Sequence, residues 1–403
     1  MCNAFRKDQI AIEVAPRHIK ALDGVRGIAI LMVMMGHFWL GSRPETAAGR
    51  AFSGIVQNGW VGVDLFFVLS GLLIMGLLLD AKGSQGYFRN FYARRALRIF
   101  PLYYGFLFMW FFVLPAVFDI PPEAPYAADG VTQLWFWSYL SNFLSVFTSF
   151  ETPHGLNHFW SLAIEEQFYL IWPAVVLLVS NRTLRIICLV MIPAGLLFRL
   201  WLISLDQGHT AAYVLLPARM GTLAIGAWLA SAVRDPALRE WVNANAYRFL
   251  LASIAVLIAL NLPDLRMEGH EVAMQTLGFP MLAILSASLV VFALRSDNRW
   301  YQRFFETRGL RFFGKYSYGM YVMHLPIVVM FNVLGFGVST LPRIGPSDLF
   351  GAIVFSATAM LATTVAAYGS WHLFEKRFLK LKRHFPTQDP EVSGGSIALR
   401  KAS

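Results

Sequence analysis

The sequence predicts an all-α protein that crosses a membrane about ten times. Hydrophobic residues make up 57% of the 403 residues, only 14% are charged, and the mean hydropathy is +0.53. A soluble protein with so few charged residues would have too little polar surface to cover its core. Apolar runs of about twenty residues, long enough to cross a bilayer as a helix, also recur along the chain.

Ten of these apolar runs are predicted to be membrane spans. Their ranges are 24–41, 59–79, 100–118, 160–179, 184–203, 213–233, 247–262, 275–294, 316–336 and 349–372. They divide the chain into an N-terminal segment (1–23), a membrane domain (24–372) and a basic tail (373–403). From Pro386 the tail is polar and carries Pro and Gly, so we expect this last part to be disordered.

Basic residues indicate how the spans are oriented. The chain has 34 Lys and Arg against 24 Asp and Glu, and most of the basic residues fall in one set of alternate loops. The other set carries only Arg43, Arg50, Arg266 and Arg343. Cytoplasmic loops of membrane proteins are rich in Lys and Arg, so both termini are predicted to be cytoplasmic. The net charge of +10 therefore reflects topology, and no nucleic-acid partner is expected.

A further apolar stretch, 133–150, is predicted to be a re-entrant or interfacial segment. It is short, aromatic and rich in Ser. Counting it as an eleventh span would place the basic loop 295–315 outside, against the excess of basic residues expected in cytoplasmic loops.

The first span carries two ionisable residues, Arg26 and His37, eleven positions apart. Eleven steps of about 100° return to within roughly 20° of the same helix face, after a rise of about 16 Å. Both side chains are therefore expected along one stripe of one helix. Ionisable groups inside a membrane are costly, which makes them candidates for function.

On this topology, six ionisable groups of both signs lie at one level in the outer half of the membrane. They are His37, Asp64, Glu165, Glu166, Arg199 and Arg219. The set predicts a polar chamber, although each residue alone is also compatible with a buried ion pair, or for His37 with helix packing. A His beside a carboxylate suits general-base catalysis. Because Glu165 and Glu166 are adjacent, they point about 100° apart, and at most one is expected to face the chamber.

Other polar residues allow two interpretations each. His324 precedes Pro326 within a span, which fits either a kinked helix or a site. Arg94, Arg95 and Arg98 precede the third span, where they either set topology and contact anionic lipid or hold phosphate groups. Arg26 would join the same phosphate site. The sequence has no HExxH motif and no Cys/His ligand spacing, so no metal is predicted.

Seven motifs in order resemble the acyltransferase-3 family of integral membrane O-acyltransferases. They are LDGVRGIAILMVMMGHF at 22–38, GVDLFFVLSGLLI at 62–74, YARRALRIFPLYY at 92–104, NHFWSLAIEEQFYLIWP at 157–173, LPARMGTLAIGAWLA at 216–230, SYGMYVMHLP at 317–326 and HLFEKRF at 372–378. The resemblance covers nearly the whole chain, and the spacing of Arg26 and His37 matches the family without departure.

The resemblance implies an enzyme of the cytoplasmic (inner) membrane that moves an acyl group, commonly acetyl. The donor would be a cytoplasmic acyl-CoA, above all acetyl-CoA, and the acceptor a hydroxyl of a glycan or glycolipid at or beyond the membrane. His37 would be the essential catalytic His, Arg26 its paired Arg, and Arg94, Arg95 and Arg98 the family's basic motif. Some members carry a fused extracytoplasmic domain, and this chain is expected to act alone or with a separate partner.

Together these observations predict roles for twelve residues. Catalysis is assigned to His37, Asp64, Glu165 and Glu166, donor binding to Arg26, Arg94, Arg95 and Arg98, and substrate binding to His158, Arg199, Arg219 and His324. In this hypothesis His37 activates the acceptor hydroxyl while a carboxylate orients its ring, with a covalent acyl-His as the variant. The alternatives are a proton-coupled transporter that uses the same groups, and a scaffold for a lipid-linked glycan.

Overall fold

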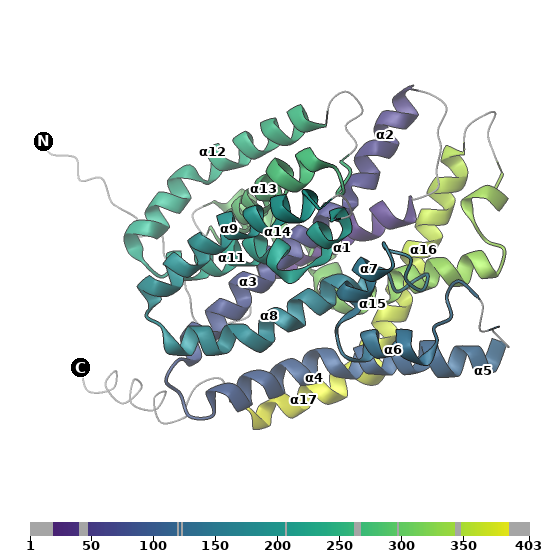
Figure 1. Ribbon diagram of the computed structural model, residues 1–403, viewed down its shortest axis with the longest axis horizontal. Coiled ribbons are helices and arrows are strands. Elements are labelled where there is room, and N and C mark those ends of the chain that lie inside the picture. The colour runs from purple at the N-terminus through teal and green to yellow at the C-terminus, as the bar shows by residue number, and fades with distance from the viewer. Residues whose placement is uncertain are drawn as a thin grey trace, which may run out of the picture.

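The computed structural model describes residues 19–39, 47–118, 121, 124–205, 208–261, 267–295, 298–342 and 348–386. Within these ranges the regular elements are all helical, and they pack side by side as a bundle (Figure 1). Ten helical runs are long and apolar enough to cross a bilayer, so the predicted all-α class and number of spans are confirmed. The protein is an integral, multi-pass membrane protein.

The bounds of the spanning runs follow the chain. The first five runs are α1 (Lys20–Phe38); α2 (Ala47–Gln57), η1 (Asn58–Val61) and α3 (Gly62–Ala81); α4 (Tyr87–Phe108), η2 (Met109–Val113) and α5 (Leu114–Phe118); α8 (Phe159–Leu178); and α9 (Asn181–Ile203). The last five are α10 (His209–Val214) and α11 (Leu216–Ala232); α12 (Pro236–Leu260); η3 (Met274–Gly278) and α13 (Phe279–Leu294); α15 (Arg308–Val333) with η4 (Val338–Thr340); and α16 (Leu349–Ser370), η5 (Trp371–Glu375), α17 (Lys376–Lys380) and η6 (Leu381–His384). The short α14 (Arg299–Phe305) precedes α15.

Several helices extend beyond the apolar run that predicted them. α4 begins at Tyr87 rather than near residue 100, and α12 begins at Pro236 rather than near 247. Hydropathy detects only the apolar part of a helix, whereas Arg and Lys are good helix formers and keep their charges in water at its end. For the same reason the last helical run continues past residue 372 to His384. Residues 387–403 of the predicted tail lie outside the described residues.

The apolar stretch 133–150 is not a span. It forms α6 (Gly130–Trp137) and α7 (Ser141–Phe147), which are separate and too short to cross a bilayer. Tyr139, between the two helices, has a φ of 55°, a left-handed conformation that interrupts a right-handed helix. The prediction of a further, non-spanning segment is therefore confirmed.

Glycines allow α1 to pack very closely against its neighbours. α1 contacts α3, α13, α15 and α16. A Cβ on Gly27 would lie 2.0 Å from the carbonyl oxygen of Leu310 in α15, and one on Gly24 would lie 1.8 Å from the carbonyl oxygen of Phe305 in α14. Small residues at such crossings let membrane helices approach backbone to backbone. This contact fixes the helix that carries both Arg26 and His37.

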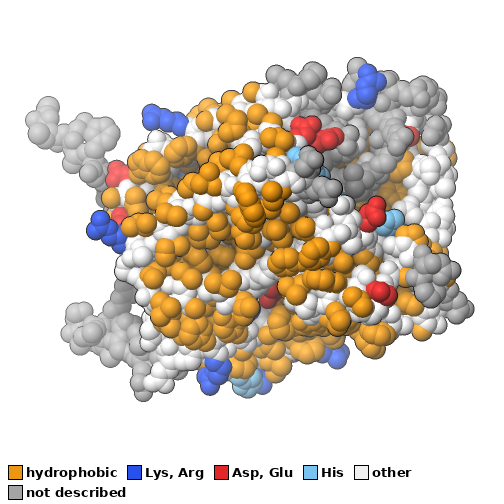
Figure 2. All heavy atoms as spheres, viewed as in Figure 1, with side chains coloured by type: hydrophobic (Ala, Val, Ile, Leu, Met, Phe, Trp, Pro, Cys, Tyr) orange, Lys and Arg blue, Asp and Glu red, His pale blue; other side chains and the backbone are white. Residues whose placement is uncertain are grey.

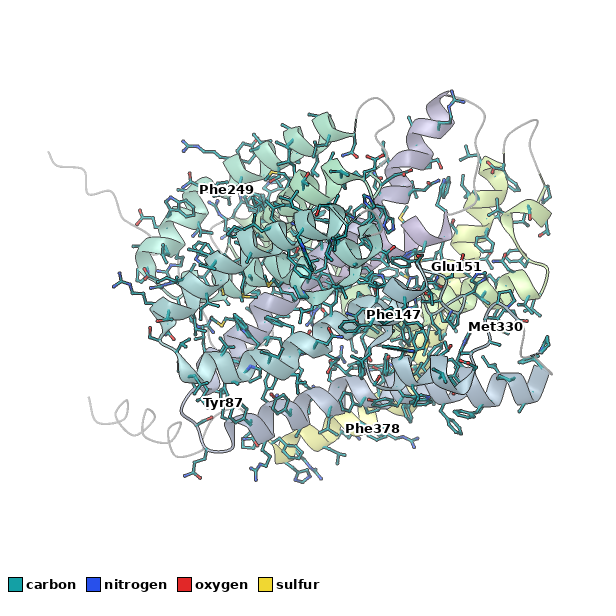
Figure 3. All side chains as sticks on the ribbon, viewed as in Figure 1. Tyr87, Phe147, Glu151, Phe249, Met330 and Phe378 are labelled. Atoms are coloured by element: carbon teal, nitrogen blue, oxygen red, sulfur yellow. The ribbon has the colours of Figure 1, made fainter. Side chains whose placement is uncertain are left out.

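The surface of the bundle is hydrophobic across its middle. Figure 2 shows hydrophobic side chains covering the centre of one face, while the coloured charged groups lie mostly toward its margins. This distribution is what a lipid-facing surface requires. In Figure 3, Tyr87 and Phe249 lie toward one end of the bundle, and Glu151 and Met330 lie toward the other.

We expect Gly27→Ala to destabilise the protein. The added methyl group would press against the backbone of Leu310, and such overpacking costs about 1–3 kcal/mol. Gly369→Ala in α16 is the matched control, because a Cβ there has no neighbour within 4 Å among the described residues. Melting temperatures of the purified variants in detergent test this, and equal values for the two would contradict the close α1–α15 crossing.

Candidate active site

Three neighbouring cavities run through the bundle. The basic cavity, about 630 Å³, includes Tyr87 in its wall, and the histidine cavity, about 370 Å³, includes His37. A smaller middle cavity of about 110 Å³ shares three arginines with the basic cavity, and Val63 and Tyr321 with the histidine cavity. Tyr87 lies toward one end of the bundle in Figure 3, whereas Glu151, next to Phe150 of the histidine cavity, lies toward the other. The shared walls thus connect the two ends.

Seven cationic side chains line the basic cavity, with Asp23 as the acidic residue in its wall. They are Arg26, Arg94, Arg95, Arg98, Arg311, Lys315 and Lys382. The predicted cluster of Arg26 with the three arginines of α4 is therefore brought together. Guanidinium groups bind phosphate oxygens through two parallel hydrogen bonds, so this cavity suits a ligand with several phosphates.

The last helical run completes the basic cavity. Arg94 donates to the carbonyl oxygens of Phe385 at 3.0 Å and Lys382 at 3.4 Å, which holds the end of this run against α4. α17 lies alongside α4, as Figure 1 also shows. Trp371 lines the cavity and lies 5.1 Å from the guanidinium of Arg98, a cation–π contact.

Both Glu165 and Glu166 line the middle cavity. The expectation that at most one of them faces a chamber is therefore wrong, because the cavity wraps around enough of α8 to include both directions. Glu165 accepts a hydrogen bond from Ser70, which in turn accepts one from Tyr169 at 2.9 Å. The guanidinium of Arg95 lies 4.9 Å from the ring of Tyr169. The glutamates thus lie beside the shared arginines rather than beside His37.

Three histidines meet at the histidine cavity. His37 is at the end of α1, and its Nδ1 is hydrogen bonded at 3.0 Å to Nε2 of His324 in α15. His324 donates from Nδ1 to the carbonyl oxygen of Tyr321 at 2.7 Å. The ring of His158 lies 4.6 Å from that of His324, and neither of its buried nitrogens has a hydrogen-bond partner within the described residues. The sequence gave no reason to join His324 to His37.

Asp64 does not orient His37. Its Oδ1 accepts from Nη2 of Arg219 at 2.8 Å, and both side chains are 0% exposed. The guanidinium of Arg219 lies 4.0 Å from the ring of Phe279, and that of Arg199 lies 5.4 Å from the same ring. The alternative of a buried ion pair between helices is thus what the structure has for Asp64. Neither Arg199 nor Arg219 is among the described residues that line the three cavities.

Sequence reasoning missed four residues of the basic cavity. They are Arg311, Lys315, Trp371 and Lys382. Arg311 and Lys315 are four positions apart at the start of a span, so a helical spacing was available to place both on one face. No comparable signal exists for Lys382, because its position depends on how the last helix folds back along α4. In the described part of the chain, no three His, Cys, Asp or Glu residues are grouped so as to hold a metal.

The fold and cavities describe a polytopic membrane protein with a polar passage through its core. Comparison of the sequence with protein families then places it: a family model described as an acyltransferase domain matches residues 19–372, so the chain belongs to the acyltransferase-3 family. The resemblance identified from the seven motifs is confirmed. No solved structure matches the chain.

Curated relatives are similar over most of the chain. YrhL of Bacillus subtilis is 28% identical over 382 residues, which are 89% of this chain and 55% of that protein. The peptidoglycan O-acetyltransferase OatA of Listeria monocytogenes is 28% identical over 78% of this chain and 50% of its own length. The O-acetyltransferase OatA of Staphylococcus aureus is 28% identical, with shares of 79% and 52%. The chain thus spans about half the length of these relatives.

Arg219→Met is expected to destabilise the fold strongly. It leaves the Asp64 carboxylate buried without its partner, and breaking a buried pair costs about 3–5 kcal/mol. Combining it with Asp64→Leu is expected to restore part of this loss, since no unpaired charge then remains. The unfolding free energy in mixed micelles is the measurement.

The matched control for that pair is Arg185→Met, which breaks the partly exposed contact with Asp235. Exposed pairs contribute about 0–1 kcal/mol, so its effect is expected to be small. A double variant less stable than Arg219→Met alone would contradict the ion-pair role of Asp64.

Proposed function

We propose that the protein is a membrane O-acyltransferase. It moves an acyl group, in particular acetyl, from cytoplasmic acyl-CoA to a hydroxyl of an envelope glycan, and His37 is the general base. The observation that carries the proposal is the passage from a cavity with seven cations to a histidine pair. A transporter would need the same polar interior, but it has no comparable need for a phosphate-binding cavity at one end.

The basic cavity suits the donor. Coenzyme A carries several phosphates on its nucleotide part, and seven cationic side chains with one acidic residue offer the charge to hold them. The narrower middle cavity then accepts the thin acyl-bearing arm, and it leads to the wall that contains Tyr321. With the positive-inside orientation, the basic cavity opens toward the cytoplasm, where acyl-CoA is found, and the protein resides in the cytoplasmic membrane.

The histidine cavity suits a glycan acceptor. Aromatic side chains and polar groups alternate in its wall, which fits a ligand that has apolar ring faces and many hydroxyls. The aromatic residues are Trp60, Phe150, Trp160 and Tyr213, and the polar ones include Gln57, Asn157, His158 and Glu268. The unpartnered nitrogens of His158 are free to bind an acceptor hydroxyl. Of the four residues predicted to bind substrate, His158 keeps that role, while Arg199 and Arg219 support the fold.

The chemistry is a direct transfer. The acceptor hydroxyl gives its proton to the free ring nitrogen of His37 as its oxygen attacks the thioester carbonyl carbon. A C–O bond forms, the C–S bond breaks, and His37 returns the proton to the departing thiolate, which leaves as coenzyme A. Glu165 and Glu166 lie near Arg26 and Arg95 in the middle cavity, so we assign them to positioning these arginines rather than to orienting His37.

The relatives support the same class of reaction. Two of the proteins compared above are named as O-acetyltransferases, and one name specifies peptidoglycan. Purified protein in liposomes, given acetyl-CoA labelled in the acetyl group and isolated peptidoglycan strands, is expected to transfer label to the glycan as a base-labile ester. Mass spectrometry of the strands locates the modified hydroxyl. Glycan without label, together with proton-driven uptake of a solute, would favour a transporter.

His37→Ala is expected to abolish this transfer, with a loss of at least about 10²-fold from the missing general base. The protein is expected to remain folded, because the ring lies at a cavity wall. His154→Ala, an exposed histidine outside the three cavities, is the control. Near-normal product from the His37 variant would refute its assignment as the base.

Arg98→Met is expected to raise the KM for acetyl-CoA about tenfold or more, while the KM for glycan changes little. Arg98 lines both the basic and the middle cavities, and a charge-assisted hydrogen bond to a phosphate contributes about 1.5–3 kcal/mol. Arg89→Met is the matched control from the same helix, because Arg89 is exposed and outside these cavity walls. Initial rates over a range of acetyl-CoA concentrations separate the two variants, and equal KM values would contradict the donor site.

A further inference from the structure

We propose that His324 is a positioning residue that fixes the proton of His37 on Nδ1 and so makes Nε2 the base. This inference rests on the proposed function for its catalytic meaning, but the tautomer itself follows from the hydrogen bonds. A histidine thereby fills the place that a carboxylate commonly has beside a catalytic histidine.

The chain of hydrogen bonds begins at a backbone carbonyl. The oxygen of Tyr321 can only accept, and it lies 2.7 Å from Nδ1 of His324, so Nδ1 carries a proton. A neutral His324 then has its lone pair on Nε2. That atom lies 3.0 Å from Nδ1 of His37, which must therefore donate. A neutral His37 is left with its lone pair on Nε2, the nitrogen not engaged by His324.

Packing holds both rings in this arrangement. His324 is 0% exposed, and its ring lies among those of Phe38, His158 and Tyr321, with centroids 6.3, 4.6 and 5.5 Å away. Next to His37, a Cβ on Gly36 would lie 3.0 Å from Gly59, so the end of α1 rests directly on η1. Neither ring can turn far without breaking these contacts, and the orientation needed for proton transfer is therefore set before a substrate binds.

The alternative partner for His37 is a carboxylate, and the structure offers none in hydrogen-bond contact. Glu268 is the acidic residue among the described residues of the histidine cavity wall, and no hydrogen bond joins it to His37. Asp64 is paired with Arg219. When His37 accepts a proton during transfer, the resulting imidazolium keeps its Nδ1–H bond to the lone pair of His324. That acceptor stabilises the positive charge without being protonated itself.

Two substitutions of His324 distinguish this role from a structural one. His324→Gln places an amide oxygen near the position of Nε2, where it can accept the proton of His37, and kcat is expected to stay within about tenfold of the original. His324→Leu fills the space without an acceptor. It is expected to lower kcat by about 10²- to 10⁴-fold, the range seen when a catalytic histidine loses the group that sets its tautomer. The KM for acetyl-CoA is expected to change less than about twofold in both.

The assay uses full-length protein in liposomes with labelled acetyl-CoA and peptidoglycan strands, and His154→Leu is the control. Equal loss in the Gln and Leu variants, unchanged kcat in the Leu variant, or a change confined to KM would each overturn the positioning role. Gel filtration and melting temperature check that each variant is folded.

A spectroscopic measurement keeps the proposal testable if His324→Leu does not fold. Solid-state nitrogen NMR of ¹⁵N-histidine protein in lipid, with His37 assigned by comparison with His37→Ala, reports which ring nitrogen carries the proton. A proton on Nδ1 is expected, and one on Nε2 would overturn the inference. If wild-type protein transfers no label but His37 is protonated on Nδ1, the proposed function fails while the tautomer assignment stands.

Discussion

A polar group inside a bilayer must find its partners within the protein, and this requirement arranges the whole bundle. Three sets of buried groups meet it differently. Asp64 and Arg219 neutralise each other among aromatic rings and hold α3 to α11, away from the cavities. His37 and His324 satisfy each other through one nitrogen apiece, which leaves a second nitrogen of His37 unused. The arginines around Arg26 share a cavity with too few acids to neutralise them, so they retain capacity for an anionic ligand.

The sequence was enough to predict the class of fold and the most informative helix, but not the partners across the bundle. Ten apolar runs and the stripe of Arg26 and His37 depend on local periodicity, which one sequence contains. Depth in the membrane also follows from a span, and that is why His37, Asp64 and the glutamates appeared to share a level. Direction around the bundle axis does not follow from depth. Residues at one level therefore proved to lie in separate environments, and the partner of His37 came from a helix 287 positions along the chain.

The same limit explains which parts of the basic cavity were predicted. Arg94, Arg95 and Arg98 are adjacent in sequence, so their cluster was evident before the fold was known. Lys382 and Trp371 come from the last helical run, whose return along α4 depends on tertiary contacts such as the Arg94 bonds to backbone carbonyls. Hydropathy also ended this run at residue 372, because basic residues conceal a helix from a scale that measures only apolar character.

The unequal charge of the two ends gives the passage a direction. Seven cationic side chains beside a single acidic one repel each other when the basic cavity holds no anion, and a polyphosphate relieves that repulsion on binding. The histidine cavity has no such excess of charge, so it offers little to the phosphates and much to an uncharged thioester and a hydroxyl. A donor bound by its charged end is therefore held with its reactive end extended through the middle cavity. Binding energy gained at the arginines is thus used to place a carbonyl carbon near His37, at a distance where the arginines themselves do not disturb its basicity.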